Sequence, residues 1–161
     1  NITKVVASFR WVTSLPGTGY GNFNAIKPLD KEVLKARVQI VSKKLENLVG
    51  SGIKLVLIYP VPEAGEDVPN YTVKKRILGN KKFILKIPYS SFFDRNKYAY
   101  DALDLVSTTE EVFRVYPSQV LCEEIPDGYC KTVMNGKSLY YDDDHLSNYG
   151  ASLIMPLLFE D

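Results

Sequence analysis

The stretch KLVLIYPVP at residues 54–62 is a continuous apolar run that two prolines end. A run of strand length without polar alternation is typical of a β-strand covered on both faces, and prolines end it because they cannot donate to a ladder. Before it, apolar residues recur at helical spacing within a polar segment, at positions Leu34, Val38, Val41, Leu45 and Leu48. This pattern predicts an amphipathic helix that Asp30 caps and that ends at residues 50–52 (Gly-Ser-Gly).

The alternation of strand and helix continues on both sides of this unit. Residues 2–11 (ITKVVASFRW) and residues 112–116 are rich in β-branched and aromatic residues, which predicts strands. Residues 92–106 have rough helical spacing of apolar residues. Such alternation predicts an α/β fold with a mainly parallel sheet, in which ligands bind beyond the carboxyl ends of the strands.

The remaining segments are less regular. Residues 63–71 are interpreted as a loop, and residues 137–141 as an extended arm that follows an Asn-Gly turn. We expect Ser147 to cap a last helix that runs to about Phe159, with a kink at Pro156 because proline removes a backbone hydrogen bond.

The composition is that of one ordinary globular domain. The chain has 161 residues, of which 45% are apolar and 24% charged, and its formal net charge is +1. These values exclude a disordered, collagen-like or coiled-coil chain. So small a net charge gives no support for a nucleic-acid partner. A local basic cluster is interpreted as a solvated surface; it consists of Lys74, Lys75, Arg76, Lys81 and Lys82.

Two cysteines, Cys122 and Cys130, flank a turn signal at residues 126–128 (Pro-Asp-Gly). A turn between two extended arms would bring the cysteines face to face, so that a local disulfide is one interpretation and two free thiols are the other. A disulfide would imply an oxidising compartment. Zinc is not expected, because the chain has no second pair of Cys or His ligands.

The segment YYDDDHLS at residues 140–147 contains the only histidine of the chain, His145. Asp142 precedes it by three positions, a spacing that lets a carboxylate reach Nδ1 and leaves Nε2 free to face a nucleophile. We expect the carboxylate within about 3.2 Å of the ring. Two alternatives are an acidic helix start with a surface histidine, and a metal site formed by Asp142, Asp144 and His145. The segment lacks the register of a calcium loop, so no metal is expected.

Residues 141–151 (YDDDHLSNYGA) resemble the last conserved block of SGNH-fold esterases and acetyltransferases. The resemblance is greatest to the SGNH domain fused to the C-terminus of membrane acyltransferase-3 proteins, which O-acetylate bacterial surface polysaccharides. Residues 5–11 (VVASFRW) and 58–68 (IYPVPEAGEDV) are similar to further blocks in the same order, and Cys122 and Cys130 are similar to the family's paired cysteines. The resemblance implies a three-layer α/β/α, SGNH-hydrolase-like (flavodoxin-like) fold.

In that family the Asp and His of the last block belong to a Ser-His-Asp triad, which implies catalytic roles for Asp142 and His145. Asp143 and Asp144 occupy variable positions and receive no role. The family's serine lies in an early Gly-Asp-Ser block, and this chain has no Gly-Asp-Ser. The expectation is therefore that residues 1–161 form the C-terminal portion of a single SGNH domain whose N-terminal part is missing. The sheet should lack a central strand or borrow one from another chain. The isolated chain should be inactive, and it should be either unstable or prone to associate.

The resemblance implies O-acetyl transfer to hydroxyls of a polysaccharide such as a lipopolysaccharide O-antigen. The alternatives are an SGNH carbohydrate esterase or deacetylase and a non-catalytic glycan-binding module. Arg10 and Trp11 are expected to line the sugar site. The alternative is that Arg10 is an ordinary surface charge and Trp11 a core residue.

The expected partners are an acetyl donor, a polysaccharide acceptor, a fused or associated transmembrane acyltransferase domain and the missing N-terminal part. No cofactor is expected to bind directly, with acetyl-coenzyme A as the ultimate acyl donor. The expected location is the periplasmic face of a bacterial inner membrane.

Overall fold

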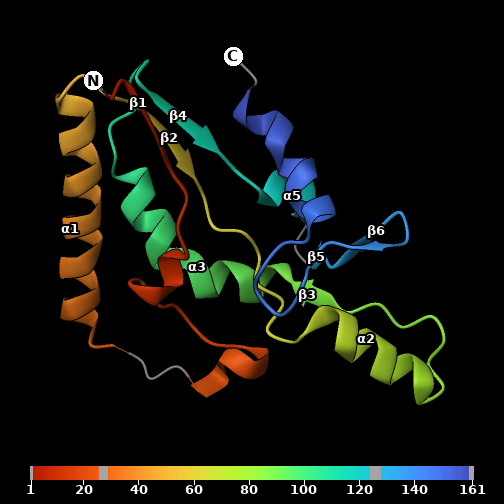
Figure 1. The fold of residues 1–161 in the computed structure, drawn as a ribbon. Coiled ribbons are helices and arrows are strands. Elements are labelled where there is room, and N and C mark those ends of the chain that lie inside the picture. The colour runs from red at the N-terminus through yellow and green to blue at the C-terminus, as the bar shows by residue number, and fades with distance from the viewer. Residues whose placement is uncertain (1, 26–28, 124–127, 160–161) are drawn as a thin grey trace.

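The computed structural model describes residues 2–25, 29–123 and 128–159. Its central sheet has three parallel strands in the order β1-β2-β4, with bounds β1 Lys4–Ala7, β2 Lys54–Ile58 and β4 Val112–Val115 (Figure 1). Val5 pairs with Leu55, and Leu55 pairs with Val112. The predicted parallel sheet is confirmed, and the apolar run quoted above forms its middle strand.

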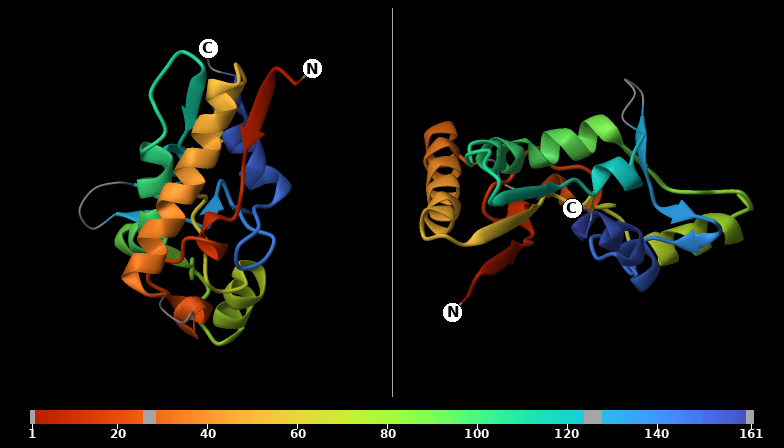
Figure 2. Two further views of the ribbon diagram at one scale, coloured as in Figure 1. Left: turned by 90° about the vertical axis from the view of Figure 1, so that its left-hand side faces the viewer. Right: turned by 90° about the horizontal axis from the view of Figure 1, so that it is seen from above.

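Strand β2 is buried on both faces, as its sequence predicts. Leu55 and Leu57 point into a core that contains side chains of α1 (Lys31–Gly50) and α3 (Tyr89–Asp104). Val56 points to the opposite face, into a core that contains Ile154 of α5 (Asn148–Ile154). Figure 2 shows α1 and α3 on one side of the strands and α5 on the other. The fold is therefore the expected α/β class with helices on both faces of a parallel sheet.

Helix α1 begins and ends as predicted. The Asp30 side chain accepts a hydrogen bond from the Glu32 N–H at 2.8 Å, and the helix runs to Gly50. Its buried side carries Leu34, Val38 and Leu45, which are three of the five residues that predict the helix. Among the described residues, no helix combines the length and the apolar composition of a membrane span.

The first strand and the loop expected at residues 63–71 differ from their predictions because tertiary contacts and a cap decide them. The first strand ends at Ala7 instead of Trp11, since the chain turns into a short 3₁₀ helix, Trp11–Thr13, that places the indole in the core. The expected loop at residues 63–71 contains the start of helix α2 (Val68–Ile77). Asp67 caps α2 by accepting from the Asn70 N–H at 3.0 Å.

The last helix is shorter than predicted. Ser147 caps it, as expected, by accepting from the Gly150 N–H at 3.1 Å. The α-helix ends at Ile154, and Pro156 lies in a 3₁₀ helix, Met155–Leu158, that follows. Proline has no N–H to continue the α-helical ladder, so it ends this helix where a kink was expected.

A disulfide joins Cys122 at the end of helix α4 (Ser118–Leu121) to Cys130 in strand β5 (Tyr129–Lys131). Pro126 and Asp127, part of the predicted turn, lie outside the described residues. Strand β5 also pairs antiparallel with β3 (Lys86–Pro88).

Strands β6 (Val133–Met134) and β7 (Lys137–Ser138) form a hairpin around the predicted Asn-Gly turn. Asn135 and Gly136 have φ values of 52° and 74°, the left-handed conformation that such a two-residue turn requires. A further 3₁₀ helix, Gly21–Ala25, completes the elements of the described residues.

Strand β1 is an edge strand in the described part of the chain, and no strand pairs with its outer side there. Val6 in the strand and Phe9 just after it are each about half exposed, although both are apolar. The missing N-terminal part stays a prediction.

Candidate active site

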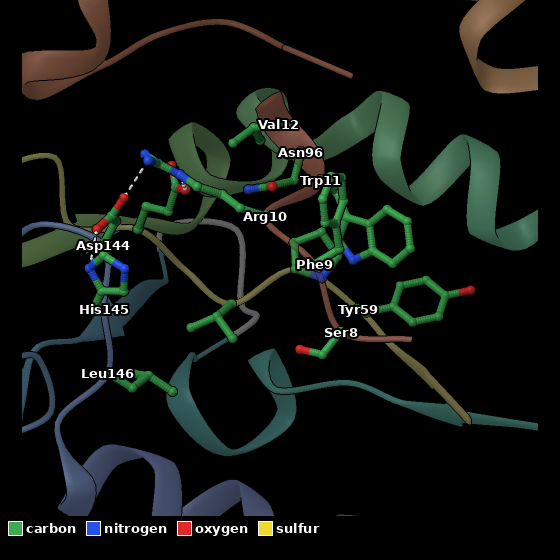
Figure 3. Close-up of a pocket in the computed structure, with 13 residues that line it drawn as sticks. Ser8, Phe9, Arg10, Trp11, Val12, Tyr59, Asn96, Asp144, His145 and Leu146 are labelled. Atoms are coloured by element: carbon green, nitrogen blue, oxygen red, sulfur yellow. Dashed lines mark hydrogen bonds and ion pairs between the residues drawn. The ribbon is translucent and has the colours of Figure 1, made fainter. Parts of the chain in front are cut away.

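A pocket of about 280 Å³ lies beyond the carboxyl ends of β1 and β2, where the fold class predicts a ligand site. The chain leaving β1, the chain leaving β2, helix α3 and the loop before α5 together form its walls (Figure 3). The residues that line it are Ser8, Phe9, Arg10, Trp11, Val12, Tyr59, Pro60, Val61, Glu63, Asn96, Asp144, His145 and Leu146.

The loop that carries His145 is closed by its own backbone. The Tyr141 N–H donates to the His145 carbonyl at 2.8 Å, and the Ser147 N–H donates to the Leu139 carbonyl at 2.9 Å. Inside the loop, Asp142 Oδ1 accepts from the backbone N–H groups of Asp144 at 3.0 Å and of His145 at 2.7 Å. One carboxylate oxygen therefore holds the loop, which leaves the other for the ring.

Asp142 Oδ2 lies 2.9 Å from Nδ1 of His145, within the predicted distance. This contact orients the ring through Nδ1 and leaves Nε2 for a substrate or nucleophile. Partial burial of Asp142 acts to raise the pKa of its carboxyl, but the backbone N–H groups of His145 and Asp144 and the imidazole outweigh it and lower this pKa to about 2. The hydrogen bond that the ring donates to Asp142, followed by the charge of Asp144, raises the pKa of His145 above its ordinary 6.5.

Asp144 is a second carboxylate beside the imidazole. Its Oδ1 lies 2.8 Å from Nδ1 of His145, and its side chain is 8% exposed, compared with 31% for Asp142. Burial raises the pKa of Asp144, while the charges of Arg10 and His145 lower it. The sequence alone assigned Asp144 no role, yet two carboxylates flank the same ring nitrogen.

Arg10 connects Asp144 to a buried glutamate. Its Nη1 lies 2.5 Å from Asp144 Oδ2, and its Nε donates to Glu63 Oε1 at 2.6 Å. Glu63 Oε2 in turn accepts from Nε of Arg95 at 2.6 Å and pairs with its Nη2 at 2.6 Å. A charged network therefore runs from Arg95 through Glu63, Arg10 and Asp144 to His145.

Arg10 and Trp11 both line the pocket, but each also has a structural contact. Arg10 is held by two carboxylates, as described above. Trp11 is buried, and its indole N–H donates to the Ile58 carbonyl at the end of β2 at 3.0 Å. Their predicted contact with a sugar stays a prediction.

Sequence reasoning missed Glu63 and Arg95. Arg95 lies between Phe92 and Ala99 on the buried side of α3, and only 1% of its side chain is exposed. A charged residue on the apolar side of a predicted helix indicates a buried partner of opposite charge. That signal could have identified Arg95, but it does not say which of the 19 acidic residues is the partner.

A cation is a poor fit to the three side chains that the metal alternative names. Ligand atoms of Asp142, Asp144 and His145 lie within 4.8 Å of one another. The Arg10 guanidinium already pairs with Asp144 Oδ2, and two backbone N–H groups already bind Asp142 Oδ1. A metal ion would have to compete with these contacts, so we assign the three side chains to the protein's own network.

Comparison with known proteins gives one family and one solved structure. A family model described as an SGNH domain (fused to AT3 domains) matches residues 1–160. No curated protein matches the chain. The chain is similar to a structure titled as that of the Salmonella ser. Paratyphi A lipopolysaccharide acetyltransferase periplasmic domain, with 19% identity and a TM-score of 0.49. The match covers 80% of this chain and 49% of that one, so the chain spans about half the length of that structure.

Proposed function

Since this chain belongs to the family of SGNH domains fused to AT3 domains, we propose that it takes part in O-acetyl transfer to hydroxyls of a bacterial surface polysaccharide. The observation that carries the proposal is the Asp142–His145 pair, 2.9 Å apart, beside a pocket at the carboxyl ends of two parallel strands. In this proposal His145 is the proton carrier of a Ser-His-Asp triad, and Asp142 is the carboxylate that orients its ring.

The serine would come from outside residues 1–161, because the chain has no Gly-Asp-Ser block. In the first step, His145 Nε2 takes the serine proton while the serine oxygen attacks the carbonyl carbon of an acetyl donor. The donor's leaving group then departs with the proton that His145 returns, and an acetyl-serine remains.

In the second step a sugar hydroxyl replaces the leaving group. His145 Nε2 removes the proton of that hydroxyl, whose oxygen attacks the acetyl-serine carbonyl, and the proton then returns to the serine oxygen. Asp142 stabilises the imidazolium that forms in each step, and Asp144 adds a second negative charge beside Nδ1. The net change moves one acetyl group from donor to sugar.

The donor would reach the site through a fused or associated transmembrane acyltransferase domain, with acetyl-coenzyme A as the ultimate source. The AT3 fusion that is typical of the family supports this arrangement. It also supports a location of this chain at the periplasmic face of a bacterial inner membrane.

The test is made on the complete protein that contains these residues. The variant His145→Ala should reduce polysaccharide acetylation by about a thousandfold or more, and Asp142→Asn should also reduce it strongly. Ser8→Ala is a matched control, because Ser8 lines the pocket but lies in no Gly-Asp-Ser block. It should leave acetylation nearly unchanged.

Other outcomes would favour the alternatives. Full acetylation by His145→Ala would show a non-catalytic glycan-binding module. Acetyl release to water that does not depend on a polysaccharide acceptor would show an esterase. Loss of acetylation in Ser8→Ala with retained folding would place the nucleophile inside this chain.

A further inference from the structure

One segment concentrates positive charge. Residues 68–93 contain no Asp or Glu, and six basic residues fall within them: Lys74, Lys75, Arg76, Lys81, Lys82 and Lys86. Because the whole chain has a formal net charge of only +1, the rest of it is acidic on balance. None of these six side chains forms an ion pair with another described residue. The segment therefore presents positive charge that no acidic side chain of the described residues neutralises.

Apolar side chains lie among these charges. Val73 and Ile77, one turn apart on α2, are 55% and 78% exposed, with Lys74 and Arg76 beside them. Leu78 and Ile84, in the chain after α2, are also exposed. We call residues 73–84 the basic-apolar surface.

The exposed residues of α2 do not belong to its core-facing side. Val68 and Thr72 are buried and fix that side, and Tyr71 packs edge-on against Phe83 with ring centroids 5.7 Å apart. The helix thus has one side in contact with the domain and a second apolar strip, Val73 and Ile77, that faces outward. Exposed apolar side chains that gather among charged residues, instead of lying singly, are typical of an interaction surface.

We propose that the basic-apolar surface contacts the anionic face of a lipid bilayer. A membrane interface matches both properties, because apolar side chains enter the acyl boundary while Lys and Arg meet anionic headgroups. A soluble polyanion would use the charges alone and leave Val73, Ile77 and Leu78 in water. The proposal rests on the fusion to a membrane domain that we propose above, and it does not depend on the triad.

The position of α2 gives this contact a consequence for the site. Helix α2 lies at the end of the molecule opposite α1 (Figures 1 and 2). Its first residue, Val68, donates its N–H to the Asp142 carbonyl at 3.2 Å, and the Ala64 N–H donates to the Asp143 carbonyl at 2.7 Å. A bilayer contact at α2 would therefore set the height and orientation of the His145 loop above the membrane.

The test measures binding of the full chain to vesicles by co-sedimentation. Vesicles of phosphatidylglycerol and phosphatidylcholine in equal parts should bind the chain, and phosphatidylcholine alone should not. The variants V73S/I77S and K81S/K82S should each bind about tenfold more weakly or worse, since each removes apolar area or headgroup attraction. V33S/I40S is the matched control, because Val33 and Ile40 are exposed apolar residues on α1, and it should bind as the unmodified chain does.

Three results would overturn the proposal. Equal binding by V73S/I77S and the unmodified chain would show that the apolar strip is not used, and a loss seen only in K81S/K82S would indicate a soluble polyanion as the ligand. Absence of binding to the anionic vesicles would point to a protein partner. His145→Ala should bind vesicles normally, so failure of this proposal and failure of the proposed acetyl transfer are distinguishable.

Discussion

Replacing Glu63 by glutamine should destabilise the folded chain by about 3 kcal/mol, because removing one partner of a buried ion pair leaves the other charge uncompensated. Glu63 is buried, and Arg95, with 1% of its side chain exposed, directs Nε and Nη2 at the same Glu63 oxygen, each at 2.6 Å. Arg95 Nη1 already has no partner among the described residues. Glutamine keeps the shape of the side chain, so the loss of stability measures the effect of removing the charge and not of changing the volume.

Arg10 should contribute little to this loss of stability. Its side chain is 45% exposed, so that water screens its charge when Glu63 is neutral. We therefore place the expected loss near the lower end of the range for buried pairs, about 3 kcal/mol.

The assay is urea unfolding followed by far-ultraviolet circular dichroism. Glu32→Gln is the matched control, because Glu32 forms an exposed pair with Lys35 at 3.8 Å on α1, and its loss should be within about 0.5 kcal/mol. A second arm combines Glu63→Gln with Arg95→Met. The double variant should lose about 1–3 kcal/mol less than the sum of the single losses, because the two groups interact directly. The expected role of Glu63 is refuted if Glu63→Gln unfolds at the same urea concentration as Glu32→Gln. It is also refuted if the stability losses of Glu63→Gln and Arg95→Met simply add, because Glu63 and Arg95 would then not stabilise each other.

The further predictions concern the His145 loop. In the complete protein, acetylation should fall as the pH drops through a value above 6.5, because His145 must be neutral to accept a proton and Asp142 and Asp144 raise its pKa. Asp144→Asn should move this limb of the kcat/KM profile to lower pH while rescue by Asp144→Glu restores it, and an unmoved limb would contradict a role for Asp144. The same raised pKa means that the protonated ring stabilises the fold below pH 6.5, and that this contribution is lost as the pH rises through the folded-state pKa. Gly150→Ala should disturb the loop and reduce both stability and acetylation, because a Cβ there would overlap the Leu139 carbonyl oxygen. Gly50→Ala is the control, since Gly50 has open space around it, and it should be neutral or slightly stabilising. Equal stability of the two variants would contradict this packing.

The parts of the fold that the sequence predicts well are those decided by local periodicity. Strand β2 and helix α1 have their expected positions because each leaves its own apolar pattern in the sequence. Burial of β2 on both faces gives a continuous apolar run, and burial of α1 on one side gives apolar residues at helical spacing. The end of β1 was not predictable in this way. Trp11 leaves the strand conformation to place its indole in a core built from distant segments, and no local pattern reports that contact.

In the candidate site, too, local contacts could be predicted from the sequence and contacts between distant segments could not. Asp142 and His145 are three positions apart, so their contact could be predicted from a turn. Glu63 and the two arginines that it pairs with come from three separate segments, which only the folded sheet and α3 bring together. The loop predicted at residues 63–71 includes the first turn of helix α2, because the apolar residues of this helix lie on both of its sides and conceal the helical period.

The chain has one tryptophan, and the structure places it in the wall of the pocket. The fluorescence emission of its indole depends on the polarity of its surroundings. The same ring donates a hydrogen bond to the carbonyl at the end of β2. The domain therefore has an intrinsic fluorescent reporter beside the His145 loop, and occupancy of the pocket should be readable by fluorescence without any added label.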